Sequence, residues 1–129
     1  KKKNTKAMIK SMENKYVNII GHPDDARIAI DYTELAKAAS EYGVLIEINN
    51  SSLKPTSFRQ NAEENYKILL EECYKNEVYV IINSDAHIHT DIGESNEALE
   101  VIKKSGFPEE LVTNTDILKL KQRLGLRRR

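Results

Sequence analysis

Two short segments of the chain carry residues that can do metal or acid–base chemistry. Asp85 and His87 follow the apolar run Val78–Ile82, and His22 follows the apolar run Val17–Ile20. Unbroken apolar runs of this length are typical of parallel strands that are buried on both faces. Residues two apart in an extended chain point the same way, so Asp85 and His87 are predicted to converge on one ion. A carboxylate and two neutral imidazoles suit zinc, manganese or iron.

Structural roles are also open for these polar residues. His22 precedes a proline and can cap a turn, and Asp85 can accept hydrogen bonds from loop amides. Glu47 lies inside the apolar run Val44–Ile48, where a buried carboxylate must be paired or hydrogen-bonded. A core ion pair and a role in the site therefore both remain open for Glu47. His89 would point to the same side as Asp85 and His87 only if the chain stayed extended as far as His89.

Apolar runs and helix-forming segments alternate around these residues. The predicted order is strand 17–20, helix Tyr32–Tyr42, strand Val44–Ile48, loop Asn49–Gln60, helix Ala62–Asn76, strand Val78–Ile82, helix Glu94–Lys104, a short strand Leu111–Val112 and helix Asp116–Leu124. Asp31 or Thr33 can cap the first of these helices, and Gly43 ends it. Thr115 is predicted to cap the last helix and Gly125 to end it. This alternation predicts an α/β protein with a parallel barrel or doubly wound sheet.

Composition indicates a single, ordinary globular domain. The chain has 129 residues, of which 40% are hydrophobic and 31% charged, with a net charge of zero. Balanced charge disfavours a general nucleic-acid groove, and the basic runs Lys1–Lys3 and Arg127–Arg129 are expected to be solvated ends. No apolar run reaches the roughly 18 residues of a membrane span, so a cytoplasmic location is expected. The lone Cys73 is predicted to pack on a helix face.

Three segments, in this order and separation, resemble the polymerase-and-histidinol-phosphatase (PHP) family of metal-dependent hydrolases. They are IIGHPDD (Ile19–Asp25), VLIEINNSS (Val44–Ser52) and INSDAHIHTDIGE (Ile82–Glu94). The resemblance runs from about Ala7 to the C-terminus and is closest to the small stand-alone phosphoesterases of the family. It implies a distorted parallel (β/α)7 barrel that holds up to three metal ions, zinc or alternatively manganese or iron. These ions activate water for attack on a phosphate ester.

The resemblance also implies roles for particular residues. His22, Asp85 and His87 match metal ligands, and Asp85 is also expected to hold or accept a proton from the attacking water. His89 does not belong to the implied ligand set. Contacts to the phosphate are expected, without a motif match, from a loop leaning over the site: Asn49, Asn50, Ser51 and Arg59.

One departure from the family pattern is large. The HxH motif that follows the first strand in PHP proteins is absent, and the chain contains 3 histidines. Residues 1–129 are therefore predicted to form a single partial PHP domain, the C-terminal part of the barrel, with an incomplete metal cluster. Such a half-barrel is expected to leave two parallel strand edges exposed, which can pair with another chain to form a homo-oligomer.

The expected function is phosphatase-type hydrolysis of a small phosphomonoester, such as histidinol phosphate, by metal-activated water. The partial domain alone is expected to be inactive. Two alternatives remain open: a nuclease-type PHP module acting on nucleic acid, which the balanced charge disfavours, and a non-catalytic chain that self-associates.

Overall fold

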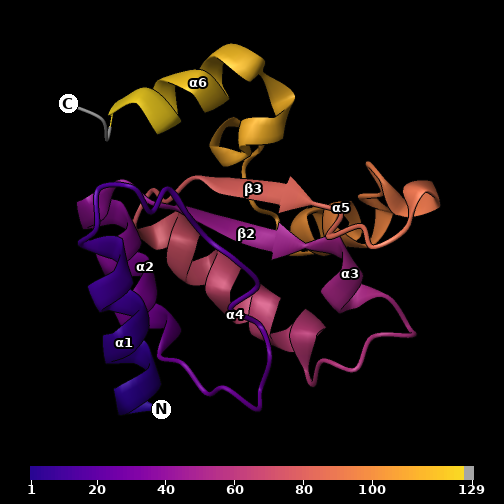
Figure 1. Cartoon of the computed structure of the whole chain (residues 1–129), viewed down its shortest axis with the longest axis horizontal. Helices are drawn as coiled ribbons and strands as arrows, with labels where there is room; N and C mark the ends of the chain where they lie inside the picture. Colours follow the sequence, from indigo (N-terminus) through magenta and orange to yellow (C-terminus); the bar gives the residue numbers. More distant parts are fainter. Residues whose placement is uncertain (127–129) are drawn as a thin grey trace.

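The computed structural model describes residues 1–126 and shows an α/β architecture built on a parallel sheet (Figure 1). The predicted run Arg127–Arg129 lies outside the described residues. The strands are β1 (Ile19–Ile20), β2 (Leu45–Asn49) and β3 (Val80–Asn83), in the order β1-β2-β3. Register pairs Ile20 with Ile46 and Ile46 with Val80. The predicted parallel α/β class is confirmed, whereas the described residues do not show a (β/α)7 barrel.

Helices surround this sheet. They are α1 (Lys2–Met12), α2 (Tyr32–Tyr42), α3 (Asn50–Leu53), α4 (Ala62–Lys75), α5 (Asn96–Lys104) and α6 (Ile117–Leu126), with 3-10 turns η1 (His89–Asp91), η2 (Glu109–Leu111) and η3 (Thr113–Thr115). Figure 1 shows α2 and α4 on one side of the sheet and α6 on the other. The main core joins side chains of β2 and β3, such as Ile46 and Val80, to buried residues of α4, such as Leu69. None of the helices within residues 1–126 combines the length and the apolar character needed to cross a membrane.

The sequence signals for α2 are confirmed. Asp31, one of the two predicted caps, accepts a hydrogen bond from the Glu34 N–H at 3.3 Å. Gly43 ends the helix with φ of 63°. This left-handed conformation is strained for residues with a Cβ atom and suits glycine. Both ends of the helix therefore lie where the local sequence predicts them.

One prediction about a loop is wrong. The expected loop Asn49–Gln60 begins with the short helix α3, because the Asn49 side chain accepts a hydrogen bond from the Ser52 N–H at 2.9 Å. The chain then stays irregular around Pro55 until α4 begins. This single helical turn lies at the end of β2 and starts the segment that returns toward α4 (Figure 1).

The C-terminal helix also differs from the prediction. Thr115 lies in η3, and its hydroxyl donates to the Val112 carbonyl oxygen at 3.0 Å instead of capping the helix. Asp116 precedes the helix and accepts a hydrogen bond from the Leu118 N–H at 2.7 Å. Gly125 lies inside α6 and does not end it. A glycine costs only about 1 kcal/mol in a helix interior, which is too little to force termination.

Side chains cover the outer edge of β3. Asn114 accepts a hydrogen bond from the Ile82 N–H at 2.7 Å and donates one to the Ile82 carbonyl oxygen at 2.8 Å. Thr113 donates to the Val80 carbonyl oxygen at 2.9 Å, and the predicted strand Leu111–Val112 is reduced to one bridge between Val80 and Val112. Two exposed edges were predicted. Within residues 1–126 only β1 lacks a strand or such a cover on its outer side.

Cys73 has the predicted structural role. It is fully buried in the core on α4, and burial raises the pKa of its thiol far above the usual range. A thiol with a raised pKa stays protonated at neutral pH and is a poor nucleophile.

The edge cover on β3 can be tested with Asn114→Ala. Loss of two hydrogen bonds to Ile82 is expected to lower the free energy of unfolding by about 1–2 kcal/mol in urea denaturation. Asn4→Ala is the matched control, since Asn4 makes one hydrogen bond at 3.4 Å to the Ala29 carbonyl oxygen. Equal effects of the two substitutions would contradict the proposed cover.

Candidate functional site

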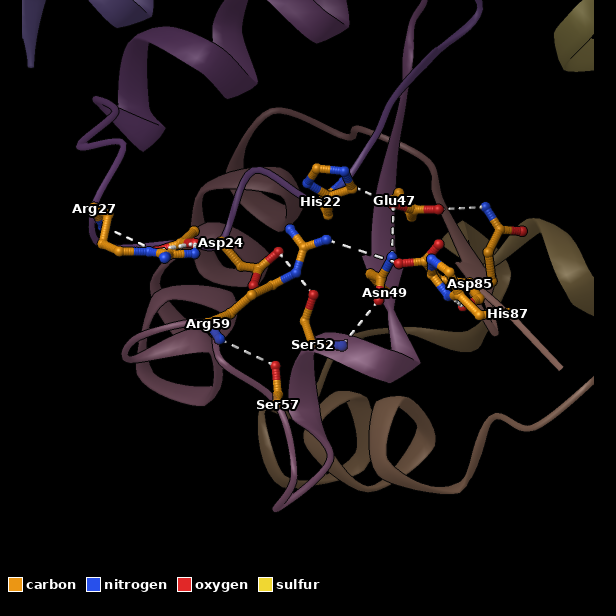
Figure 2. Close-up of polar contacts among 12 residues, drawn as sticks. His22, Asp24, Arg27, Glu47, Asn49, Ser52, Ser57, Arg59, Asp85 and His87 are labelled. Atoms are coloured by element: carbon orange, nitrogen blue, oxygen red, sulfur yellow. Dashed lines mark hydrogen bonds and ion pairs between the residues drawn. The ribbon is translucent and has the colours of Figure 1, made fainter. Parts of the chain in front are cut away.

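A buried carboxylate connects the carboxyl ends of all three strands. Glu47 on β2 is 9% exposed, and its Oε2 accepts a hydrogen bond from the backbone N–H of His22 at 2.7 Å (Figure 2). Its Oε1 accepts from Asn83 Nδ2 at 2.8 Å, and Oε2 also lies 3.4 Å from Asn49 Nδ2. These partners are N–H groups and not the cation of the core ion pair considered above. Glu47 thus holds the loop after β1 against the end of β3.

A second buried carboxylate, that of Asp24, holds the same loop in place. Asp24 Oδ1 accepts hydrogen bonds from the Tyr66 hydroxyl at 2.8 Å and from Ser52 Oγ at 3.3 Å. The Tyr66 oxygen in turn accepts the Asn49 N–H at 2.9 Å, and Asn65 Nδ2 donates to the Asp24 carbonyl oxygen at 2.6 Å. Burial and the nearby Asp24 charge raise the pKa of Tyr66 well above its usual value. Tyr66 therefore stays protonated and remains a hydrogen-bond donor to Asp24.

The loop after β1 also contains an ion pair. Arg27 donates from Nε to both carboxylate oxygens of Asp25 at 3.0 Å and from Nη2 to Oδ2 at 2.5 Å. This contact holds the pKa of Asp25 far below its usual range. Asp25 is nearly buried, so the pair fixes the direction in which the Arg27 side chain leaves the loop.

Five of the seven predicted site residues share one cavity of about 300 Å³ at this end of the sheet. It is lined by His22, Ser51, Thr56, Ser57, Phe58, Arg59, Asp85 and His87. All three predicted metal ligands and two of the four predicted phosphate contacts, Ser51 and Arg59, therefore lie around the same space. We call this cavity the polar compartment.

The other two predicted phosphate contacts point elsewhere. Asn49 and Asn50 are buried, and Asn49 caps α3. Asn50 Oδ1 accepts the Ala98 N–H at 2.9 Å, and its Nδ2 donates to Glu97 at 2.8 Å. Both amides connect structural elements and do not line the polar compartment.

The chain after β3 does not stay extended as predicted. Asp85 has φ of 52°, in the left-handed region, which turns the backbone. This turn places His87 Nδ1 2.8 Å from the Asp85 carbonyl oxygen. A carbonyl only accepts, so Nδ1 of His87 is the donor of this hydrogen bond, and in the neutral imidazole the lone pair lies on Nε2. His89 lies in η1, is exposed and does not line the polar compartment.

Two of the four non-glycine residues with positive φ within residues 1–126 lie at the site, and the other two, Asn61 and Glu77, lie at the ends of α4. His22 has φ of 31° and Asp85 has φ of 52°, and both are residues with a Cβ atom. Such conformations cost on the order of 1–3 kcal/mol and persist only when surrounding contacts enforce them. The hydrogen bond from the His22 N–H to Glu47 is one of these enforcing contacts.

The donor types suit a divalent metal ion, but their arrangement is incomplete. Among residues 1–126, no three His, Cys, Asp or Glu side chains gather closely enough to hold an ion. Zinc sites in proteins take three or four protein ligands. His22, Asp85 and His87 therefore do not form a metal centre by themselves in this structure.

Arg59 supplies positive charge to the polar compartment. Its side chain is 13% exposed, and Nη2 lies 3.7 Å from Asp85 Oδ2 (Figure 2). This separation is longer than a hydrogen bond, so Asp85 does not saturate the donors of the guanidinium group. The Arg59 N–H donates to Ser57 Oγ at 3.2 Å, which helps to hold the loop that carries both residues.

Three lining residues were not predicted. Thr56, Ser57 and Phe58 lie on the irregular segment between α3 and α4. Hydroxyl side chains next to an arginine are a composition that can bind phosphate, and this signal is present in the sequence. The buried carboxylate of Asp24 was also missed, because its partners Tyr66 and Asn65 lie about 40 residues later in the chain.

Comparison with known proteins shows similarity over nearly the whole chain. The chain is 44% identical over 127 residues to a "probable phosphatase" of Thermoanaerobacter sp. (strain X514), covering 98% of the chain and 51% of that relative. A "probable phosphatase" of Caldanaerobacter subterraneus subsp. tengcongensis is 42% identical over 127 residues, or 98% of the chain and 49% of the relative. One of Clostridium novyi is 39% identical over 117 residues, or 91% and 47%.

All three relatives are named probable phosphatases. The chain spans about half the length of the curated relatives it matches. No family model matches the sequence.

The central role of Glu47 can be tested with Glu47→Gln. The amide keeps the size but replaces one acceptor oxygen by a donor that faces other N–H groups. The free energy of unfolding is expected to fall by about 1–3 kcal/mol, with faster amide hydrogen exchange at His22. Glu110→Gln, at an exposed position, is the control. Unchanged exchange at His22 would rule out Glu47 as the group that holds this loop.

The Asp25–Arg27 pair predicts a pH dependence of stability. The pKa of Asp25 is lower in the folded chain than its unfolded value of about 3.9, so its contribution is present above that value and is lost as the pH falls below it. Asp25→Asn should therefore be less stable than the wild type at pH 7, and the gap should narrow below about pH 4. Urea denaturation at several pH values measures this gap. Glu13→Gln, which removes an exposed pair with Lys10, should show little change.

Proposed function

We propose that this chain is part of a metal-dependent phosphoric monoester hydrolase of the PHP family, acting on a small phosphorylated molecule. The observation that carries the proposal is the polar compartment, where the motif residues His22, Asp85 and His87 meet Arg59. The names of the relatives and the three PHP-like segments support the same reaction class. Histidinol phosphate is one substrate consistent with this class.

Arg59 is the proposed phosphate anchor. A guanidinium group can donate two parallel hydrogen bonds to phosphate oxygens, and its contact with Asp85 is long enough to leave donors free. The hydroxyl groups of Ser51 and Ser57 line the same compartment and can donate to the remaining oxygens. Asp85 faces Arg59 across this space and is the proposed acceptor for a proton from water.

His22, Asp85 and His87 are the proposed contribution of this chain to the metal site. The free Nε2 of His87 and the carboxylate of Asp85 are ligand atoms of the right type. Since the described residues do not gather three such groups, the proposal requires further ligands from outside them. Zinc, manganese and iron all accept this mixture of imidazole and carboxylate.

Phosphate binding tests the role of Arg59. Arg59→Ala is expected to weaken binding of inorganic phosphate about tenfold or more in a calorimetric titration, because a charge-assisted, two-point contact is lost. Arg59→Lys should restore part of the affinity, since the charge remains but the paired geometry does not. Arg123→Ala is the control, because Arg123 stacks on Tyr79 and does not line the polar compartment. Equal affinity in the wild type and Arg59→Ala would contradict the proposed anchor.

Metal content tests the ligand assignment. Elemental mass spectrometry is expected to find zinc, manganese or iron in an intact protein that supplies the further ligands, and His87→Ala should reduce that content. His89→Ala is a matched control, because His89 lies two residues along the same loop and does not line the compartment. An unchanged metal content in His87→Ala would contradict the assignment of His87 as a ligand.

Self-association is a second candidate role, favoured by the outer edge of β1. No strand or side chain covers this edge among the described residues, and an open groove beside it is lined by apolar groups including Met8, Val17 and Ile19. Exposed strand edges pair readily with other chains. Sedimentation is expected to show a dimer for the wild type. It should show a monomer for Ile19→Lys, which puts a charge on this edge.

A further inference from the structure

A second cavity adjoins the polar compartment and has a different chemical character. Its volume is about 280 Å³, and apolar side chains make up much of its wall: Met8, Pro23, Ile28 and Ile30. It shares His22, Phe58 and Arg59 with the polar compartment. We call this second cavity the apolar compartment. The shared residues show that the two cavities lie next to each other.

Phe58 lines both compartments. Its ring is exposed to solvent but contacts two arginine side chains. Its side chain is 75% exposed, and its ring centre lies 5.1 Å from the Arg27 guanidinium carbon and 5.9 Å from that of Arg59. Arg27 is itself fixed by its ion pair with Asp25. A single exposed aromatic residue is common and means little alone. This one is oriented by two cations and lines both cavities, so its ring is available to a ligand that occupies them.

We propose that Phe58 and the apolar compartment bind the alcohol part of the substrate, so that the substrate class is a phosphate monoester with an aromatic group beside the ester oxygen. This inference rests on the proposed function, because it places the phosphate at Arg59 in the polar compartment. From there the ester oxygen leads past Phe58 and His22, which line both spaces, into the apolar compartment.

The lining chemistry favours a ring over a polyol. Asp25 and Arg27 also line this cavity, but their side chains are already paired with each other. Hydroxyl groups of a polyol that face Met8, Ile28 and Ile30 would find no hydrogen-bond partner and would lose their contacts with water. An aromatic ring loses no such contacts and can stack on Phe58 in an offset or edge-to-face arrangement. The guanidinium groups of Arg27 and Arg59, which lie beside Phe58, would also attract the aromatic ring of the substrate. Phe58 is thus a specificity-determining residue and not a catalytic one.

Three probe molecules test the proposal on the chain: inorganic phosphate, glycerol phosphate and phenyl phosphate. Calorimetric titration of the wild type is expected to show phenyl phosphate binding about tenfold more tightly than glycerol phosphate. Phe58→Ala should weaken phenyl phosphate binding about fivefold to tenfold more than it weakens inorganic phosphate binding. Ile28→Ser, a second lining variant, should weaken phenyl phosphate binding in the same selective way.

Tyr16→Ala is the matched control for Phe58→Ala. Tyr16 is an exposed aromatic residue, 78% exposed, with a cation 5.2 Å from its ring centre, and it lines neither compartment. It should change none of the three affinities. A wild type that binds phenyl and glycerol phosphates equally overturns the inference while leaving the proposed function in place.

Two other outcomes also decide the matter. If the wild type binds no inorganic phosphate, the proposed function fails and the inference fails with it. If sedimentation shows a wild-type dimer that Phe58→Ala converts to a monomer, the ring belongs to an interface between copies of the chain, and the inference is overturned. Substrate selectivity that is lost in Phe58→Ala, together with an unchanged sedimentation coefficient, supports it.

Discussion

The buried carboxylate of Glu47 is the interaction on which the site depends. It lies on the central strand and accepts N–H donors from the loop after β1 and from the end of β3. A buried charge without a cation is costly, and these hydrogen bonds offset the cost because each is charge-assisted in a poorly screened environment. The three strand ends are thereby held in one geometry. The positions of His22 and of the β3 loop both follow from that geometry.

A second buried acid extends this polar layer beneath the site. Asp24 connects the loop after β1 to α3 through Ser52 and to α4 through Tyr66. Its other carboxylate oxygen is buried without a hydrogen-bond partner among the described residues. Polar interior groups of this kind stabilise a fold less than apolar packing but restrict it to one arrangement, which a binding site needs. The strained backbone at His22 and Asp85 fits this interpretation, since only a well-connected surrounding can maintain it.

The two outer edges of the sheet differ in whether their backbone groups are covered. Asn114 and Thr113 satisfy the outer backbone groups of β3 with side-chain atoms, so that edge offers little to another strand. The outer edge of β1 has no such cover among the described residues and lies next to apolar surface. The apolar compartment adjoins this groove, since Met8 and Gly21 line both. The matched relatives are about twice as long as this chain.

The sequence by itself determined the parallel α/β class, the limits of α2 and the grouping of His22, Asp85 and His87 at one end of the sheet. These features depend on local signals: apolar runs, a capping aspartate, a terminal glycine, and the rule that parallel strands end at the same edge. Only the tertiary structure decided which polar groups stay free to bind a ligand. Asn49 and Asn50 look like phosphate contacts in the sequence, yet Asn49 caps α3 through Ser52, and the distant Ala98 bonds the amide of Asn50. The proposed role of Phe58 in binding also depends on tertiary structure. Arg27 and other residues that line the two cavities come from different parts of the chain.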